Sequence, residues 1–131
     1  MSDYKSIFIS DVHLGSKGCQ SKYLYNFLKS HSCENLFLVG DIIDCWRLKS
    51  KLYWPQEHSN VIRNILSMAK QGTKVTYITG NHDDFLRIYQ PLELGNIELK
   101  EEHIYTTHLG KKFLIIHGDQ FDIVTRFGKS L

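Results

Sequence analysis

The fold is decided by residues 36–44, which read LFLVGDIID. Four consecutive apolar residues with aromatic and β-branched members predict a short buried strand that ends at Gly40. Two carboxylates, Asp41 and Asp44, follow this strand directly. The same order of apolar strand and polar cluster recurs three times: residues 7–9 precede Ser10-Asp11-Val12-His13, residues 75–78 precede Gly80-Asn81-His82-Asp83, and residues 113–116 precede His117-Gly118-Asp119.

Helical periodicity separates the first three strands. Apolar residues recur at helical spacing up to Leu28, behind Ser21, which we expect to be the N-cap. A second set runs from Val61 to Ala69, and Gly72 follows at the position of a helix C-cap. This alternation predicts an α/β fold with a parallel sheet and crossover helices. Further on, residues 104–107 and 112–116 flank a Leu-Gly-Lys turn and predict a hairpin.

Composition and charge fit a single domain, which we expect to span residues 1–131. Of the 131 residues, 42% are hydrophobic and 23% charged, and the net charge of +2 is too small to indicate a nucleic-acid partner. No apolar stretch is long enough to span a membrane, and the N-terminus does not resemble a signal peptide, so we expect a cytoplasmic protein. The three cysteines, Cys19, Cys33 and Cys45, are interpreted as free thiols before a disulfide or a metal site.

The four polar clusters contain side chains that suit metal ions. Ligands bind at the carboxyl ends of parallel strands, so we expect the clusters to converge at one edge of the sheet. Asp11 and His13 are two residues apart, which on an extended chain points both side chains the same way. Asp41 could bridge two ions, while Asn81 offers an amide oxygen and His117 an imidazole. This mixed set of oxygen and nitrogen ligands favours Mn, Zn or Fe.

Each cluster also has a purely structural interpretation. Gly-Asp is a common turn, an Asp or Asn at a strand end often makes an Asx turn, and His117 could be a core histidine. The functional interpretation gains its weight from four clusters at four strand ends. Gly40, Gly80 and Gly118 would then allow the backbone to approach an ion or a phosphate closely.

Together, Asp11-x-His13, Gly40-Asp41-x-x-Asp44, Gly80-Asn81-His82-Asp83 and His117 resemble the calcineurin-like metallophosphoesterase superfamily along about the whole chain. The resemblance implies an α/β/β/α sandwich of two sheets with helices outside, of which this chain would be the N-terminal part. It implies two divalent ions, which would hold a phosphate and activate water. It also assigns residue roles: Asp11, His13 and Asp41 bind the first ion, Asp41, Asn81 and His117 bind the second, His82 protonates the leaving oxygen, and Asp44 orients His82.

The nearest branch comprises the UDP-2,3-diacylglucosamine pyrophosphatase-like proteins of lipid A synthesis. Those enzymes carry Arg after the Asn where this chain has His82, so a generic phosphodiesterase role fits as well. The resemblance thus implies a hydrolase of phosphodiester or pyrophosphate bonds that acts on a small-molecule or lipid-linked substrate, either in the cytoplasm or at the periphery of the inner membrane. Arg47 and Arg87 could hold a substrate phosphate or lie at the surface. Three aromatic residues could line an acyl pocket or belong to the core: Trp46, Tyr53 and Trp54.

One part of the superfamily signature is absent, because the chain contains no Gly-His-x-His segment. That segment gives one more ligand to each ion. The alternative is therefore a truncated, inactive protein or binding module, and a protein phosphatase is a third option. An apolar face near residues 121–127 predicts a docked terminal helix or a shortened chain. A shortened chain would aggregate or form a homodimer through an exposed sheet face. Four histidines are interpreted as ordinary solvated residues: His31, His58, His103 and His108.

Overall fold

The computed structural model describes residues 3–117, so Gly118, Asp119 and the apolar face near residues 121–127 lie outside the described residues. Eleven elements follow one another within this range. They are β1 (Tyr4–Ile9), α1 (Ser21–Ser30), β2 (Cys33–Val39), α2 (Cys45–Ser50), α3 (Gln56–Lys70), β3 (Lys74–Ile78), the 3₁₀ helix η1 (Asp84–Tyr89), β4 (Leu92–Leu94), β5 (Ile97–Lys100), β6 (His103–Thr106) and β7 (Lys112–Ile115).

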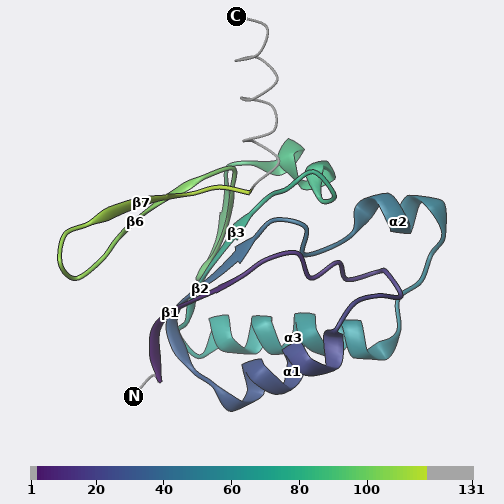
Figure 1. Ribbon diagram of the computed structural model, residues 1–131, viewed down its shortest axis with the longest axis horizontal. Helices are drawn as coiled ribbons and strands as arrows, with labels where there is room; N and C mark the ends of the chain where they lie inside the picture. The colour runs from purple at the N-terminus through teal and green to yellow at the C-terminus, as the bar shows by residue number, and fades with distance from the viewer. Residues whose placement is uncertain (1–2, 118–131) are drawn as a thin grey trace, which may run out of the picture.

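Two sheets organise these elements. The larger sheet has the order β1-β2-β3-β5-β4, in which β1, β2, β3 and β5 are parallel and β4 is antiparallel at one edge. The smaller sheet is the antiparallel hairpin β6–β7. Helices α1 and α3 cover one side of the larger sheet, and the hairpin projects on the other side (Figure 1). The predicted α/β class with a parallel sheet is confirmed.

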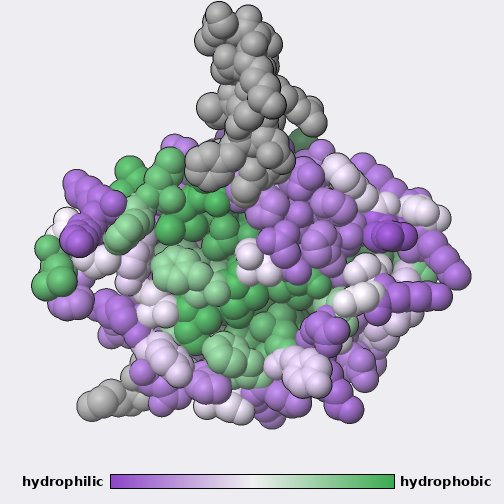
Figure 2. Space-filling model, in the orientation of Figure 1, coloured by the Kyte–Doolittle hydropathy of each residue, from purple (hydrophilic) through white to green (hydrophobic). Residues whose placement is uncertain are grey.

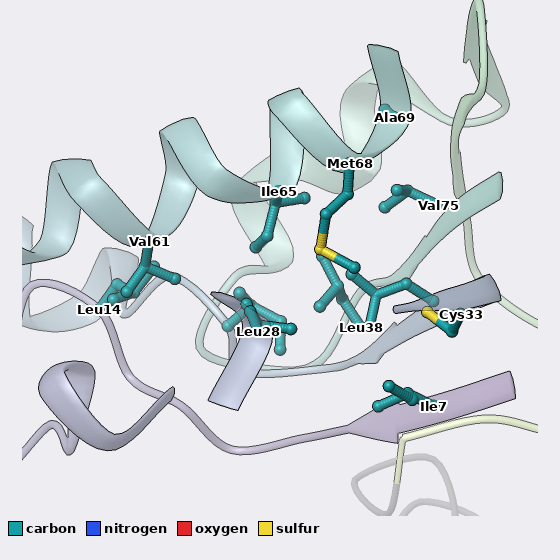
Figure 3. Close-up of a cluster of buried hydrophobic side chains, with 12 residues drawn as sticks. Ile7, Leu14, Leu28, Cys33, Leu38, Val61, Ile65, Met68, Ala69 and Val75 are labelled. Carbon is teal, nitrogen blue, oxygen red and sulfur yellow. The ribbon is translucent and has the colours of Figure 1, made fainter. Parts of the chain in front are cut away.

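The main core lies between the larger sheet and the two helices (Figure 3). Alternation along β1 and β2 turns Ile7, Leu36 and Leu38 to this side, and α3 meets them with Val61 and Ile65. Burying one such side chain stabilises the fold by about 1.5–3 kcal/mol. The core therefore fixes the strands whose ends carry the polar clusters.

Of the two predicted helix caps, one is confirmed and one is wrong. Helix α3 ends in a Schellman motif: Thr73 N–H donates to the Met68 carbonyl at 3.0 Å, and Gly72, with φ of +111°, donates to Ala69 at 3.1 Å. The C-cap prediction for Gly72 is thereby confirmed. The N-cap prediction for Ser21 is wrong, because Ser21 is the first residue of α1 and is buried, and Gln20 precedes it without a side-chain cap.

The opposite side of the larger sheet has its own apolar contacts. Phe37 is buried beneath Phe8, stacked at 4.7 Å between ring centroids, and beneath the edge of Tyr105 from β6. The expectation of a buried fourth strand is wrong, since Phe113 is 51% exposed and Leu114 is 55% exposed in β7. A two-stranded hairpin can turn only one of its faces towards the sheet.

An edge of the larger sheet is open to solvent. Strand β1 is its first strand, and Phe8 remains 46% exposed. Figure 2 shows hydrophobic surface across this face, over β1 and between the hairpin and the helices. Within residues 3–117, none of the helices has the length and apolar character needed to cross a membrane.

Candidate functional site

Six of the predicted site residues occupy loops that follow β1, β2 and β3, and these loops stay paired beyond the strands: Asp11, His13, Asp41, Asp44, Asn81 and His82. Asp11 N–H donates to the Gly40 carbonyl at 3.0 Å, and His13 N–H donates to the Asp41 carbonyl at 2.9 Å. The Gly40 N–H in turn donates to Ile78 at the end of β3. The three loops therefore form one connected layer at the carboxyl edge of the sheet, where ligands bind in parallel α/β folds.

The backbone of this layer is unusual. Asp11, His13 and Asp41 have φ of +56°, +56° and +54°, and they are the non-glycine residues with positive φ among residues 3–117. The left-handed region costs an L-residue about 1–2 kcal/mol, and such strain tends to gather at functional sites. The expected extended geometry between Asp11 and His13 is therefore wrong. Their side chains still come together, because the left-handed turns and the hydrogen bonds to the neighbouring loop aim them.

Asp11, His13 and Asp41 form a compact group. One potential ligand atom from each lies within 4.8 Å of the others, and His13 Nε2 is 3.8 Å from Asp11 Oδ1. Asp41 is 4% exposed. Burial raises the pKa of the Asp41 carboxyl, and the His82 N–H, which donates to Oδ1 at 2.8 Å, works against that rise. A buried carboxylate with this neighbourhood gains from a nearby cation.

His117 joins the group from the end of the hairpin β6–β7, which the sequence predicted and the structure confirms. Its Nε2 lies 3.3 Å from Asp11 Oδ1 and 3.5 Å from Asp41 Oδ2, and the residue is 9% exposed. Two glycines make room for it. A Cβ on Gly40 would overlap the His117 ring, and a Cβ on Gly80 would lie 2.6 Å from Asp41 Oδ1 and 2.9 Å from His117 Nδ1.

Asp44 holds two imidazoles at once. Its Oδ2 accepts from His13 Nδ1 at 2.9 Å, and its Oδ1 accepts from His82 Nδ1 at 3.0 Å and from the Arg47 N–H, which caps α2. Burial by itself would raise the pKa of Asp44, but these hydrogen bonds together lower it. A carboxylate can only accept, so both rings carry their proton on Nδ1 and keep Nε2 for other partners. The Trp46 ring lies 4.1 Å from the His82 ring.

The other predicted residues lie around this centre. Asn81 is half-buried in the loop between Gly80 and His82, and its ligand role stays a prediction. Arg47 lines a cavity beside His13 and His82. Arg87, in η1, donates from Nε to the Thr79 hydroxyl at 3.4 Å, so it is tied to the segment before Gly80.

The three aromatic residues do not form one pocket. Trp54 packs against the main core and donates to the Ser59 hydroxyl at 2.9 Å, in line with the core interpretation. Tyr53 lines the same cavity as Arg47, and Trp46 is 47% exposed over His82. The sequence interpretation of Trp46 as core is therefore wrong.

Asp83 is a structural residue whose role the sequence did not reveal. It is fully buried, and its Oδ2 accepts from the Ile42 N–H at 3.0 Å and from the Tyr77 hydroxyl at 2.5 Å. Its Oδ1 accepts from the Gly80 N–H. Asp83 therefore joins the loop after β3 to the loop after β2. The sequence did show that Asp83 belongs to the Gly-Asn-His-Asp cluster. Nothing in the local sequence, however, distinguished a residue that joins two loops from a metal ligand.

His58 corrects one sequence expectation, because it is 3% exposed and not solvated. Its Nδ1 accepts from the Gly15 N–H at 2.9 Å, and the edges of Tyr53 and Trp54 face its ring. Burial lowers the pKa of His58. The residue joins α3 to the loop that begins after His13. Half-buried His103 contacts Phe37 and Lys100, while His108 is exposed.

The chemistry of the donors fits divalent cations. Carboxylate oxygens and imidazole nitrogens converge from Asp11, His13, Asp41 and His117, and this mixed set suits Mn, Zn or Fe. A second group with the same kind of donors is His13, Asp44 and His82. In that group both histidines already donate to Asp44, which favours an orienting role for this carboxylate.

Comparisons with known proteins identify a family and several relatives of this chain. A model of the calcineurin-like phosphoesterase family matches residues 4–130. UDP-2,3-diacylglucosamine hydrolase of Porphyromonas gingivalis is 28% identical over 125 residues, covering 88% of this chain and 46% of that protein. The protein of the same name from Histophilus somni is 30% identical over 122 residues, covering 88% and 49%.

The chain thus spans about half the length of the curated relatives it matches. Among solved structures, a nuclease MPE from Pseudomonas putida aligns with a TM-score of 0.46 and 20% identity. That alignment covers 79% of this chain and 50% of the nuclease.

Proposed function

The chain belongs to the calcineurin-like phosphoesterase family. We therefore propose that it forms all or part of a metal-dependent hydrolase of phosphodiester or pyrophosphate bonds. The observation that supports this most is the convergence of Asp11, Asp41 and His117 beside the Asp44–His82 pair. Potential metal ligands and a candidate proton donor thus lie at one edge of the sheet, where a phosphoester could meet both.

Two divalent ions would be held by this chain. Asp11, His13 and Asp41 would hold one, while Asp41, Asn81 and His117 would hold the other. Bound ions offset phosphate charge and activate water as a nucleophile. The strained backbone supports the proposal, since three of these residues are non-glycine residues in the left-handed region, and such strain tends to gather at functional sites.

His82 would protonate the leaving oxygen. Asp44 accepts from its Nδ1, which fixes the tautomer and the ring orientation and leaves Nε2 to carry the transferred proton. Trp46 covers one side of the ring. The His82 backbone also donates to Asp41, so the loop that carries the acid is attached to the proposed ligand group. Proton transfer from a positioned imidazole typically contributes about 10²–10⁴-fold to the rate.

The substrate is proposed to be a pyrophosphate-linked molecule, small or lipid-linked. Two of the relatives are UDP-2,3-diacylglucosamine hydrolases, and at 28–30% identity they support the class of bond more than the identity of the attached groups. His82 stands where the resemblance to the lipid A branch implies an arginine. A generic phosphodiester is therefore the second candidate substrate.

The test measures metal content and turnover separately. Elemental analysis after dialysis against Mn²⁺ is compared for the wild type, Asp41→Asn and the exposed control Asp84→Asn, since Asn tolerates the positive φ at residue 41. We expect Asp41→Asn alone to lose metal. Hydrolysis of bis-nitrophenyl phosphate is then followed in this chain and in the product of the whole reading frame. Equal metal in all three proteins would exclude the ligand role.

The His82→Gln variant separates chemistry from metal binding. We expect it to keep the metal content of the wild type while turnover of an alkyl phosphodiester falls about 10²–10⁴-fold. A nitrophenyl ester should be less affected, because nitrophenolate leaves without a proton. Loss of metal in proportion to activity would show that His82 is a ligand. Full metal content without turnover in any form of the protein would favour a binding module.

A further inference from the structure

A cavity of about 610 Å³ opens beside the proposed catalytic centre. His13, Asp44 and His82 line one side of it. The other walls come from residues 15–18, from α2 and from the segment that follows α2. Among the residues that line the cavity, His13 is the one that is also a proposed metal ligand. The cavity is therefore an adjoining space that a substrate could enter while its reacting phosphate lies at the ligand group.

Three basic side chains line this cavity: Lys17, Arg47 and Lys51. The one carboxylate among the lining residues within 3–117 is Asp44, which already accepts hydrogen bonds from two histidines. No salt bridge found among residues 3–117 involves the three bases, whereas Lys5 pairs with a glutamate at 3.1 Å. The cavity thus concentrates positive charge that no side chain among residues 3–117 neutralises through a salt bridge, and such a cleft attracts anions.

The walls that carry these charges are well anchored. The Gly15 N–H donates to buried His58, and a Cβ on Gly15 would lie 2.9 Å from Leu48, so the loop is seated directly on α2. The Lys51 N–H donates to the Arg47 carbonyl at 2.9 Å, which closes the end of α2. Anchored walls lower the ordering cost of binding and favour one ligand geometry.

We propose that the cavity lined by Lys17, Arg47 and Lys51 is a subsite for the second phosphate of a diphosphate-linked substrate. The proposal rests on the proposed function, which places the reacting phosphate at the neighbouring ligand group. A second phosphate is joined to the first through one oxygen, so it enters a space that adjoins His13 and His82. Arg47 offers a planar fork for phosphate oxygens, and the lysines offer compact charges.

A diphosphate fits this surface better than a nucleic-acid strand. Proteins that bind single strands use a basic groove that follows the backbone, together with aromatic residues for successive bases. Here the basic residues surround one local cavity, and Tyr53 is the aromatic residue among those that line it within 3–117. Lys17 Nζ lies 5.9 Å from the centre of the Tyr53 ring, which helps to hold this cation at the cavity.

The test uses the full chain loaded with Mn²⁺ and two ligands that do not hydrolyse, methylenediphosphonate and methylphosphonate. Calorimetric titration should show that Lys17→Gln and Lys51→Gln each lower the affinity for the diphosphonate about tenfold. This is the loss expected for one charge-assisted contact. Affinity for methylphosphonate should not change. Lys49→Gln is the matched control, because Lys49 lies in α2 two residues before Lys51 but does not line the cavity. The diphosphonate also chelates free Mn²⁺, but this effect is the same for every variant and cancels in the comparison.

A second measurement does not need the metal. In EDTA, methylenediphosphonate should protect Lys17 and Lys51 from an amine-labelling reagent, with Lys49 unprotected, as read by mass spectrometry. If the lysine variants lower the affinity for both phosphonates equally, or for neither, the proposal of a subsite is overturned. Protection by a single-stranded oligonucleotide without protection by the diphosphonate would overturn it in favour of nucleic acid. A chain that takes up no Mn²⁺ yet shows the protection would contradict the proposed function and leave the subsite standing.

Discussion

Gly40 shows how a missing side chain shapes the candidate site. It has φ of +72°, and a Cβ on it would overlap the His117 ring. Gly72 has φ of +111°, and a Cβ there would meet no atom within 4 Å. Alanine at residue 72 therefore adds backbone strain alone, whereas alanine at residue 40 adds strain and displaces an imidazole. The pair separates the conformational role of glycine from its role in making space.

We expect Gly40→Ala and Gly72→Ala both to lower the free energy of unfolding, by about 1–2 kcal/mol from strain. Only Gly40→Ala should weaken Mn²⁺ binding, because only there does the added methyl group push His117 away from Asp41. Urea unfolding and calorimetric titration with Mn²⁺ measure the two effects. Unchanged Mn²⁺ affinity in a folded Gly40→Ala protein would remove His117 from the proposed ligands.

His58 gives the protein a defined response to acid. Burial lowers its pKa in the folded state, so below about pH 6.5 the unfolded chain binds more protons than the folded chain. The contribution of His58 is then complete above pH 6.5 and declines as the pH falls towards the folded-state pKa. Protonation of Nδ1 also removes the acceptor that the Gly15 N–H uses.

We expect the wild type to lose more stability between pH 7.5 and 5 than His58→Asn does. Asn keeps an acceptor near the position of Nδ1 but does not titrate. Half-exposed His31, at the end of α1, supplies the control His31→Asn, which should follow the wild type. Urea unfolding at both pH values measures the difference. An equal loss in the wild type and His58→Asn would show that His58 does not carry this dependence.

Local chemistry in the sequence was enough to select Asp11, Asp41 and His117, because each directly follows an apolar strand. The sequence also predicted that they meet at one edge of the sheet, but it did not reveal the local backbone geometry that brings their side chains together. Positive φ at Asp11 and Asp41 comes from hydrogen bonds between loops that are far apart in the chain. The burial of Asp83 likewise depends on Tyr77 and Ile42, which the sequence does not place beside it.

At the scale of elements, the hairpin β6–β7 is held to the larger sheet by Tyr105. Its ring meets Phe8 and Phe37 edge-on at 5.4 and 5.6 Å, and its hydroxyl accepts from Ser6 at 2.9 Å. His117 follows β7 by two residues, so the seating of the hairpin also sets the position of His117. One aromatic residue thus connects the packing between the sheets to the candidate metal centre.

We expect Tyr105→Phe to lower stability by about 0.5–1.5 kcal/mol, the net value of one hydrogen bond. Tyr105→Ala should cost about 2–4 kcal/mol and weaken Mn²⁺ binding, because it loosens the hairpin. Ile104→Ala is the control, since this neighbour is 62% exposed. Unfolding and Mn²⁺ titration are compared across the three variants. Normal Mn²⁺ affinity in Tyr105→Ala would show that the hairpin does not position His117.

The helices with apolar periodicity and the strands with apolar runs were predictable, whereas elements without either pattern were not. Strands β4 and β5 have three and four residues, and their alternating Leu and Glu around Gly95 gave a weak hairpin signal. Helix α2 has six residues and none of them is buried, so no amphipathic pattern marks it. Its start depends on the Asp44 cap, a carboxylate that the sequence assigned to catalysis alone.

At the scale of the whole molecule, the larger sheet is covered unequally. On the side opposite the helices, Ile78 is fully buried, but Phe8 at the β1 edge remains 46% exposed. The expectation of a bare sheet face is thus wrong over β3, where Ile78 is buried. It holds at the β1 edge, where Phe8 is exposed. The outer face of the hairpin adds a second exposed area, where Ile104 pairs across the strands with Leu114.

The sequence predicted a homodimer through an exposed face of the main sheet. Because that face is partly covered, we expect self-association to use the outer face of the hairpin instead. Ile104 is 62% exposed and Leu114 is 55% exposed, and burying such side chains contributes about 1.5–3 kcal/mol each at most. After the cost of association, two copies would pair with a dissociation constant on the order of micromolar to millimolar. We expect sedimentation velocity of this chain to show a concentration-dependent monomer–dimer equilibrium.

The double variant Ile104→Lys with Leu114→Glu tests which surface is responsible. Opposite charges directly across two strands keep the hairpin paired, while they remove its apolar outer face. The variant should therefore be monomeric at concentrations where the wild type dimerises. Leu52→Lys, at a loop residue that is 82% exposed, controls for the removal of any apolar surface side chain and should still dimerise. Dimerisation of the double variant would point instead to the β1 edge and Phe8, and a wild type that stays monomeric at millimolar concentration would exclude self-association through either surface.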